Sequence, residues 1–235
     1  MLSLVDSMIP RASDSLSHLM YKNNRFPWKP VDTELIAHGS GAAVFEVNWK
    51  DSKKVLRIYR KSLGKPLSGL IKIAGYYKKN YETLLSWYGS SPGLVLPMNF
   101  LVFSGLPFAI PVAASLQPYV HGQKQDLFED LSEDELLGLL KTNDRLREQF
   151  IFFARQTLRQ LEEQKTCFDF VGRENLMLVN QEGDYNLRIV DVGFFELNAI
   201  AKKRPDKVAK LEQRMERLVS LYELTMEVES GKTQN

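Results

Sequence analysis

The chain has a single cysteine, Cys167, among its 235 residues, so it cannot form an internal disulfide. A lack of disulfides is typical of proteins from reducing compartments. No apolar run approaches the roughly 18 residues that a membrane-spanning helix needs. The first residues also lack the basic-then-apolar pattern of a secretory signal, because Asp6, Pro10 and Arg11 interrupt it. We therefore expect a cytoplasmic protein without a transmembrane segment.

An excess of charge of one sign is also missing, since the formal net charge is +2. A balance this close to neutrality gives no strong attraction to nucleic acid or to an anionic membrane. The chain contains no internal repeat and no low-complexity tract. Its 44% hydrophobic and 26% charged residues are ordinary for a globular protein, and its length allows one sizeable core or two small lobes.

The most informative stretch is residues 167–193, which read CFDFVGRENLMLVNQEGDYNLRIVDVG. Two apolar runs, 176–179 and 187–190, flank a turn that contains asparagine and glycine, which predicts a β-hairpin. Asn175 precedes the first strand and Asp191 follows the second. Pairing of the two strands would therefore place these side chains at the same end of the hairpin.

An amide oxygen and a carboxylate this close together can share a hard cation. Mg²⁺ prefers oxygen ligands and usually keeps room for phosphate. Asp169, on the loop before the hairpin, is placed to receive a proton from an attacking hydroxyl. The stretch thus predicts a metal site at Asn175 and Asp191, with the acid at Asp169 beside it.

This order of an Asp, an Asn and an Asp-x-Gly resembles the catalytic and metal-binding half of the protein-kinase-like fold superfamily. The resemblance implies ATP-dependent phosphoryl transfer, with Mg²⁺ held by Asn175 and Asp191 and the acceptor hydroxyl oriented by Asp169. Arg173, on the same loop, is a candidate for neutralising the transferred phosphoryl group. Two departures are visible: a Cys-Phe pair replaces the usual His-Arg, and the Asp-to-Asn spacing is one residue longer than in protein kinases.

Two strands are expected at residues 35–37 and 44–47, joined through Gly39, Ser40 and Gly41. Glycines at such a turn let backbone N–H groups approach a ligand. In the resemblance this loop covers the ATP phosphates. An ordinary hairpin turn is the alternative, because the third glycine of the protein-kinase pattern is absent.

A third strand is expected at residues 53–60, with Arg57 and Tyr59 on one face. The resemblance places a phosphate-binding lysine at the position of Arg57, and a solvent-facing arginine is the alternative. A helix over residues 67–88 follows, because its apolar residues recur at three and four. In the resemblance its Glu82 pairs with Arg57, whereas a solvated surface carboxylate is the alternative.

Short strands are expected at residues 95–97, 101–103 and 108–116, and a connection between two lobes at residues 118–122. In the resemblance this hinge binds the adenine edge through backbone groups. Pro118 has no N–H, so the backbone of one of its neighbours must serve. The candidates are Gln117, Tyr119 and Val120.

The next part of the chain predicts two helices. Residues 126–141 are acidic, and Ser132 with Glu135 forms a capping box for a short helix. Acids that favour the dipole at a helix start explain most of this charge run. The strongest helix in the chain is predicted at residues 143–164, with an apolar stripe on one face and Arg and Glu on the other.

A last helix is expected from about residue 206 to residue 229. The basic patch at residues 202–217 is interpreted as a solvated helix face, because glutamates interleave with it, and attraction to nucleic acid or anionic lipid is the alternative. Residues 230–235 are expected to be a disordered tail. The chain has no Ala-Pro-Glu and no long activation segment, so a full protein-kinase second lobe does not fit.

The expected fold class is α+β: a two-lobed protein-kinase-like fold with a small antiparallel-sheet N-lobe and a truncated, mainly helical C-lobe. We expect an N-terminal extension at residues 1–32, the N-lobe at 33–117, the hinge at 118–122 and the C-lobe at 123–229.

The resemblance implies an ATP- and Mg²⁺-dependent phosphotransferase that acts on a hydroxyl-bearing acceptor. The short second lobe lacks the platform that protein kinases use for peptides, which favours a small molecule over a protein as acceptor. The main alternative is a pseudokinase, a nucleotide-binding or scaffolding module with the same fold. A third possibility is an interaction domain that binds no nucleotide, and a protein partner stays open in every case.

Overall fold

A computed structural model describes residues 33–38, 41–49, 52–103, 111–196 and 205–232. The protein is α+β, and its chain forms two compact units. The first unit comprises Met1–Lys79 and Pro97–Tyr119, and the second comprises Asn80–Leu96 and Val120–Asn235. The boundary between residues 119 and 120 falls inside the expected hinge. The expected N-terminal extension lies outside the described residues.

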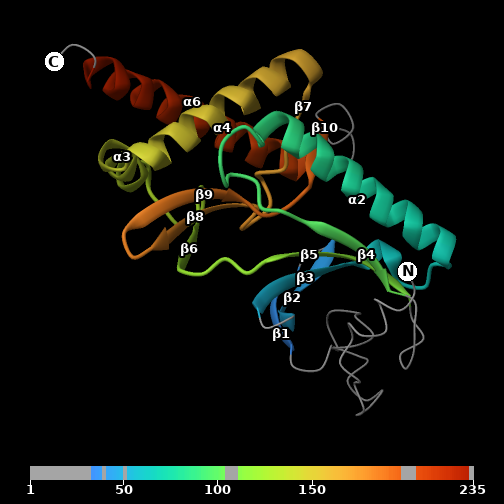
Figure 1. The fold of residues 1–235 in the computed structure, drawn as a ribbon. Coiled ribbons are helices and arrows are strands. Elements are labelled where there is room, and N and C mark those ends of the chain that lie inside the picture. The colour runs from blue at the N-terminus through green and yellow to red at the C-terminus, as the bar shows by residue number, and fades with distance from the viewer. Residues whose placement is uncertain (1–32, 39–40, 50–51, 104–110, 197–204, 233–235) are drawn as a thin grey trace. The chain divides into compact units, whose positions relative to one another are not determined.

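The first unit is built on a five-stranded antiparallel sheet with the strand order β1-β2-β3-β5-β4 (Figure 1). Its strands are β1 (Thr33–His38), β2 (Ala42–Trp49), β3 (Ser52–Tyr59), β4 (Asn99–Phe103) and β5 (Val112–Pro118). A short 3-10 helix, η2 (Arg60–Ser62), follows β3. The three strands expected before residue 60 are confirmed.

Both faces of this sheet carry apolar side chains. One face buries Phe45, Leu56 and Ile58 in a cluster that includes residues of β5. On the other face Tyr59 packs with the helix α2 (Leu67–Tyr88), and its ring stacks on Tyr77 with centroids 3.6 Å apart. The predicted alternation along β3 and the predicted bounds of α2 are therefore confirmed.

In its described residues after residue 120, the second unit combines the helices α3 (Glu133–Thr142), α4 (Asp144–Gln164) and α6 (Pro205–Lys232) with two small sheets (Figure 1). One sheet has the order β6-β8-β9 and the other pairs β10 with β7. The strands are β6 (Gln123–Asp126), β7 (Thr166–Phe168), β8 (Leu176–Gln181), β9 (Asp184–Ile189) and β10 (Phe194–Glu196).

The core of the second unit lies along α4. Leu146, Phe150 and Phe153 of the predicted apolar stripe are fully buried. Tyr88, the last residue of α2, stacks on Phe153, and its hydroxyl lies 2.9 Å from Thr157 Oγ1. These contacts place residues 80–96 in the second unit, whereas the sequence divided the chain after residue 117 only. The order of elements is the one that the kinase-like resemblance implies.

Several local expectations need correction. Arg147, expected on the polar face of α4, is buried. Its Nε lies 2.7 Å from Glu229 Oε2, and it donates a second hydrogen bond to the Leu140 carbonyl. β5 continues through Gln117 and Pro118, because both pair with β3. The predicted strand at 95–97 is a single bridge from Val95 to Ile189.

The capping box of Ser132 and Glu135 is confirmed at the start of α3. The last helix extends beyond its expected end and includes residues 230–232. The strand predicted at residues 108–116 begins at Val112 in the described part, since residues 104–110 lie outside it. Within the described ranges no helix combines the length and apolar character that crossing a membrane requires.

Candidate active site

The predicted hairpin forms and brings its two ends together. β8 and β9 pair from Leu176 opposite Ile189 to Gln181 opposite Asp184. Glu182 and Gly183 make the turn with φ of 54° and 93°, a left-handed pair that suits a tight two-residue hairpin loop. At the open end, Asn175 O accepts a hydrogen bond of 3.1 Å from Val190 N. Asn175 and the residue after Val190, Asp191, therefore lie side by side.

The loop before the hairpin is tied to the same place. Asp169 N donates to Gly193 O over 2.9 Å, and Asn175 Nδ2 donates to Asp169 O over 2.7 Å. A Cβ on Gly193 would lie 3.1 Å from Asp169 Cβ, so glycine permits this close approach. The structure thus brings the three predicted residues Asp169, Asn175 and Asp191 together within the second unit.

The carboxylate of Asp169 is half-buried, and one of its oxygens accepts hydrogen bonds from the backbone of its own loop. Its Oδ1 accepts from Val171 N over 3.2 Å and from Gly172 N over 3.1 Å. Burial raises the pKa of Asp169, the nearby Lys207 opposes that rise, and the charge of Asp191 adds to it. The other oxygen of Asp169, Oδ2, lies near Gly193: a Cβ added to that glycine would be 3.5 Å from it.

The amide of Asn175 is held in one orientation. Its Nδ2 is bound to Asp169 O, which leaves Oδ1 as the atom that can contact a cation. A Cβ on Gly172 would lie 2.3 Å from Asn175 Nδ2, so only glycine fits beside the amide. Asp191 Oδ1 accepts a 2.7 Å bond from Val192 N. In the described ranges no group of three or more His, Cys, Asp or Glu could hold a metal.

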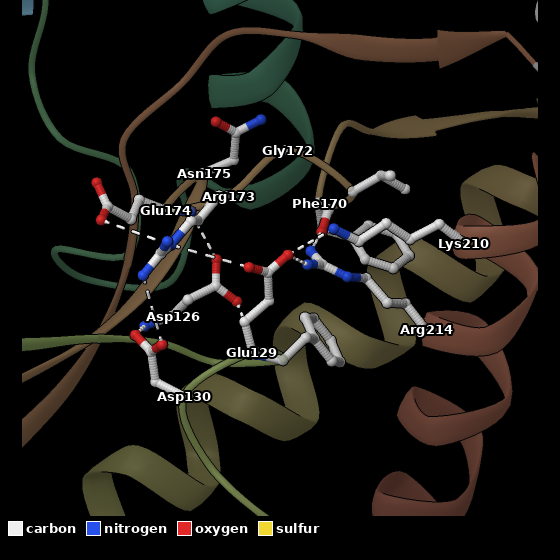
Figure 2. A network of polar contacts seen from close by, with 12 residues as sticks. Asp126, Glu129, Asp130, Phe170, Gly172, Arg173, Glu174, Asn175, Lys210 and Arg214 are labelled. Carbon is white, nitrogen blue, oxygen red and sulfur yellow. Dashed lines mark hydrogen bonds and ion pairs between the residues drawn. The ribbon is translucent and has the colours of Figure 1, made fainter. Parts of the chain in front are cut away.

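The far end of the loop is held by a residue that sequence reasoning missed. Asp126, the last residue of β6, is buried, and its Oδ1 accepts from Phe128 N and Glu129 N over 2.9 and 3.0 Å. Its Oδ2 accepts a 2.5 Å bond from Glu174 N (Figure 2). Asp126 therefore orders the loop, and the explanation of the acidic run by helix-start charges is wrong for this residue. Its position at the end of a strand of polar residues gave no signal, because its partner is 48 residues away.

Arg173 points into a group of carboxylates (Figure 2). Its guanidinium lies 3.8 Å from Glu129, 3.9 Å from Asp130 and 4.0 Å from Glu174. Its side chain is two-thirds exposed, so these pairs contribute little stability. The role of Arg173 at a transferred phosphoryl group stays a prediction.

The expectation of a solvated basic face on α6 holds for Lys210, which is exposed, and is wrong for Arg214. Arg214 is buried, with hydrogen bonds to the Phe170 carbonyl and to Glu129. Lys210 Nζ lies 2.5 Å from Glu129 Oε1, and Lys207 Nζ lies 5.7 Å from the ring centroid of Phe195. These cations recur at three and four residues, so they lie on one side of α6, and Arg214 is the one among them that is buried.

Two residues predicted to bind nucleotide in the first unit, Arg57 and Gln117, lie on one face of its sheet. Arg57 of β3 pairs with Ser115 of β5, and Gln117 pairs with Val55, two residues from Arg57. Gln117 is 5% exposed, and no donor in the described part of the chain reaches its Oε1. Gly41 is exposed at the start of β2, while Gly39 and Ser40 lie outside the described residues.

The other candidate residues are distributed over both units. Tyr119 N already donates to Lys53 O over 3.3 Å, which favours Val120 as the backbone partner in the connection. Val120 packs in the second unit against an apolar cluster formed by Leu96, Met177, Val179 and Val190. Glu82 is exposed on the part of α2 that belongs to the second unit, so its pairing with Arg57 stays a prediction.

Comparison with solved structures finds aminoglycoside phosphotransferase APH(4)-Ia at 14% identity, with 85% of this chain and 84% of that chain covered and a TM-score of 0.39. A thermostable mutant of that enzyme in ternary complex with AMP-PNP and hygromycin B matches at 13% identity, with the same coverage and a TM-score of 0.39. No family model and no curated protein matches the chain. Because these TM-scores lie below 0.5, no residue role is transferred from that enzyme.

Proposed function

We propose that the protein is an ATP- and Mg²⁺-dependent phosphotransferase that acts on a hydroxyl-bearing acceptor. The observation that carries this proposal is the convergence of Asp169, Asn175 and Asp191 through backbone and amide hydrogen bonds. An acid, an amide oxygen and a carboxylate at one hairpin end are the groups that phosphoryl transfer needs for orientation and charge neutralisation.

Asn175 Oδ1 and the Asp191 carboxylate would hold the metal. Two oxygen ligands from the protein suit Mg²⁺, which commonly keeps its other positions for phosphate oxygens and water. When bound, Mg²⁺ would neutralise charge on the phosphates of the nucleotide. The bond from Asn175 Nδ2 to Asp169 O supports this assignment, because it occupies the amide nitrogen and leaves Oδ1 as the atom that can contact a cation.

Asp169 would orient the acceptor hydroxyl and take its proton. A bond forms between the acceptor oxygen and the γ-phosphorus, the bond from that phosphorus to the oxygen of ADP breaks, and the proton moves to the carboxylate. Burial raises the pKa of Asp169, which makes it a better proton acceptor than an exposed aspartate. Lys207 would balance the charge of the carboxylate before the reaction.

Nucleotide binding is proposed for two groups of residues, one that binds the phosphates and one that binds the adenine. The phosphates would be covered by Gly39, Ser40 and Gly41 and bound by Arg57, which Glu82 would hold by an ion pair. The adenine would be bound at Gln117, Tyr119 and Val120. The buried Gln117 Oε1 supports adenine binding here. A buried acceptor without a donor destabilises the fold, and the exocyclic amine of adenine can supply that donor.

A small molecule is favoured as acceptor. β10 ends at Glu196 and α6 begins at Pro205, so the chain between them is too short for the peptide-binding platform of protein kinases. The buried Cys167 is compatible with a reducing, cytoplasmic location.

The second candidate function is a pseudokinase. It is favoured by the Cys-Phe pair in place of His-Arg, by arginine at the position of the phosphate-binding lysine, and by the carboxylate partners of Arg173. Asp191→Ala tests the first candidate: it should abolish Mg²⁺-dependent ATP turnover while the far-ultraviolet circular dichroism stays unchanged. Turnover equal to that of the wild type would refute the assignment.

Thermal shifts with ATP, with and without Mg²⁺, separate both candidates from an interaction domain that binds no nucleotide. Transfer of radiolabelled phosphate from ATP to panels of small molecules and proteins then separates an active enzyme from a pseudokinase. Labelling of a small hydroxyl compound supports the proposal, while nucleotide binding without any transfer favours the pseudokinase.

A further inference from the structure

A side chain of α6 contacts the loop that carries Asp169. Arg214 donates a hydrogen bond to the carbonyl of Phe170, the residue after Asp169 (Figure 2). The Phe170 ring is fully buried, with its centroid 5.5 Å from that of Phe128 and 6.3 Å from that of Phe153. A residue fixed at both its carbonyl and its side chain restricts the backbone of its neighbour. The Arg214 contact therefore bears on where the Asp169 carboxylate points.

Arg214 also connects the loop to the segment after β6. Its side chain is 6% exposed, and its second nitrogen lies 2.5 Å from Glu129 Oε1. Glu129 N is in turn bound by Asp126, whose other oxygen holds Glu174 N at the far end of the loop. The planar guanidinium suits such a two-acceptor arrangement. One buried arginine thus joins three separate stretches of the second unit.

We infer that Arg214 is a positioning residue for phosphoryl transfer: it fixes the Phe170 carbonyl so that Asp169 faces the acceptor hydroxyl. The catalytic consequence rests on the proposed function, whereas the ordering of the loop by Arg214 does not. A buried arginine is expensive to desolvate, and an apolar residue would fill the space more favourably if packing were its only purpose. The guanidinium supplies what an apolar residue could not, the hydrogen bonds to Phe170 O and to Glu129 Oε1.

Lys210 provides a matched control. It lies on the same face of α6 one turn earlier, and its Nζ also contacts Glu129 Oε1 at 2.5 Å. In the described part of the chain, Lys210 makes no hydrogen bond to the backbone of residues 169–175. Methionine replaces either side chain with a similar aliphatic stem and removes one positive charge. Both substitutions remove a contact to Glu129, and only Arg214→Met also removes a bond to the loop; the two sites differ further in burial, with side chains 6% and 43% exposed.

The kinetic test measures ADP release from ATP with Mg²⁺, with water as acceptor. Arg214→Met should lower kcat about 100-fold and leave KM for ATP within about threefold, because misplacement of the acid affects the reaction more than nucleotide binding. Lys210→Met should leave both values within about threefold. Arg214→Lys should recover about tenfold of the lost kcat, since its single ammonium nitrogen can still donate to one of the two acceptors. Equal losses in Arg214→Met and Lys210→Met would overturn the inference.

Hydrogen exchange on the nucleotide-free full chain gives a second readout that does not need activity. The amides of Asp169 and Glu174 are bound to Gly193 O and to Asp126 Oδ2. Arg214→Met should speed their exchange about tenfold relative to Lys210→Met, with α4 unchanged. If Arg214→Met does not fold, Arg214→Lys replaces it, with the same direction of change expected.

The two tests separate the inference from the function on which it rests. A wild-type chain without ATP turnover rejects the proposed function, and the exchange comparison still decides the positioning role. Loop exchange at the wild-type rate in folded Arg214→Met, or in Arg214→Lys where that variant replaces it, rejects the role of Arg214.

Discussion

Asp126→Asn is the change that most directly tests how the loop of residues 169–175 is held. Asparagine keeps the shape of the side chain and one acceptor oxygen. The two local bonds from Phe128 N and Glu129 N can therefore persist at Oδ1. The other oxygen becomes an NH₂ group that faces Glu174 N, so a 2.5 Å bond is replaced by two opposed donors. The variant breaks the connection between residues 126 and 174 and little else.

The magnitude follows from the burial of the site. A hydrogen bond to a charged group contributes about 1.5 to 3 kcal/mol, and a buried donor left without a partner adds a similar penalty. Asp126 is 1% exposed, so water cannot replace the lost acceptor. We expect Asp126→Asn to lower the free energy of unfolding by about 2 kcal/mol, and Asp126→Ala, which removes all three acceptor bonds, by about 4 kcal/mol.

The assay is urea unfolding of the full chain, followed by circular dichroism, with hydrogen exchange of residues 169–175 beside it. Ser132→Ala is the control: it removes the helix cap a few residues later and should reduce stability by about 1 kcal/mol without faster exchange in the loop. If Asp126→Asn unfolds within about 0.5 kcal/mol of the wild type and the loop exchanges no faster, the buried carboxylate does not hold the loop.

Three further predictions concern single groups of the second unit. Burial raises the pKa of the Cys167 thiol to about 12, so the folded protein should react with a thiol reagent at pH 8 only after urea is added; rapid labelling without urea would contradict this. Gly172→Ala places a Cβ against the Asn175 amide, and should remove the extra thermal stabilisation that Mg²⁺ adds to ATP while leaving α-helical content unchanged. The hydrogen bond from Lys210 lowers the pKa of Glu129, so the stability contributed by Glu129 is present above the ordinary glutamate pKa and is lost as pH falls through the lowered value. Glu129→Gln should accordingly reduce the dependence of the melting temperature on pH below about 4.5, and an unchanged pH profile would count against the ion pairs.

The parts of the fold that were predictable share a short range of interaction. The bounds of α2 follow from an apolar period of three and four and from the Gly-Ser-Ser-Pro that ends it. The β8–β9 hairpin follows from two apolar runs around a turn with glycine. Because the two strands of a hairpin pair antiparallel, the residue before the first strand lies beside the residue after the second. The sequence therefore also indicated that Asn175 and Asp191 lie together.

The parts that were not predictable depend on partners far away in the chain. Arg147 reads as a solvated helix residue until Glu229, 82 residues later, lies beside it. Gln117 was expected only as the residue before the connection, yet it is buried and pairs with Val55 as part of β5. A side chain on an amphipathic helix or at a strand end has no local signature of burial, since burial is decided by what packs on it.

By itself the sequence determined the secondary structure around the site and the identity of its three polar groups, because turns, periodicity and residue chemistry act over a few neighbouring positions. Only the tertiary structure decided how the loop is held. Arg214 reaches Phe170 across 44 residues, and Asp126 reaches Glu174 across 48. Such contacts exist only after α6 and β6 have packed against the loop, since the low polarity and fixed distances of a folded interior are what turn ordinary charged residues into anchors.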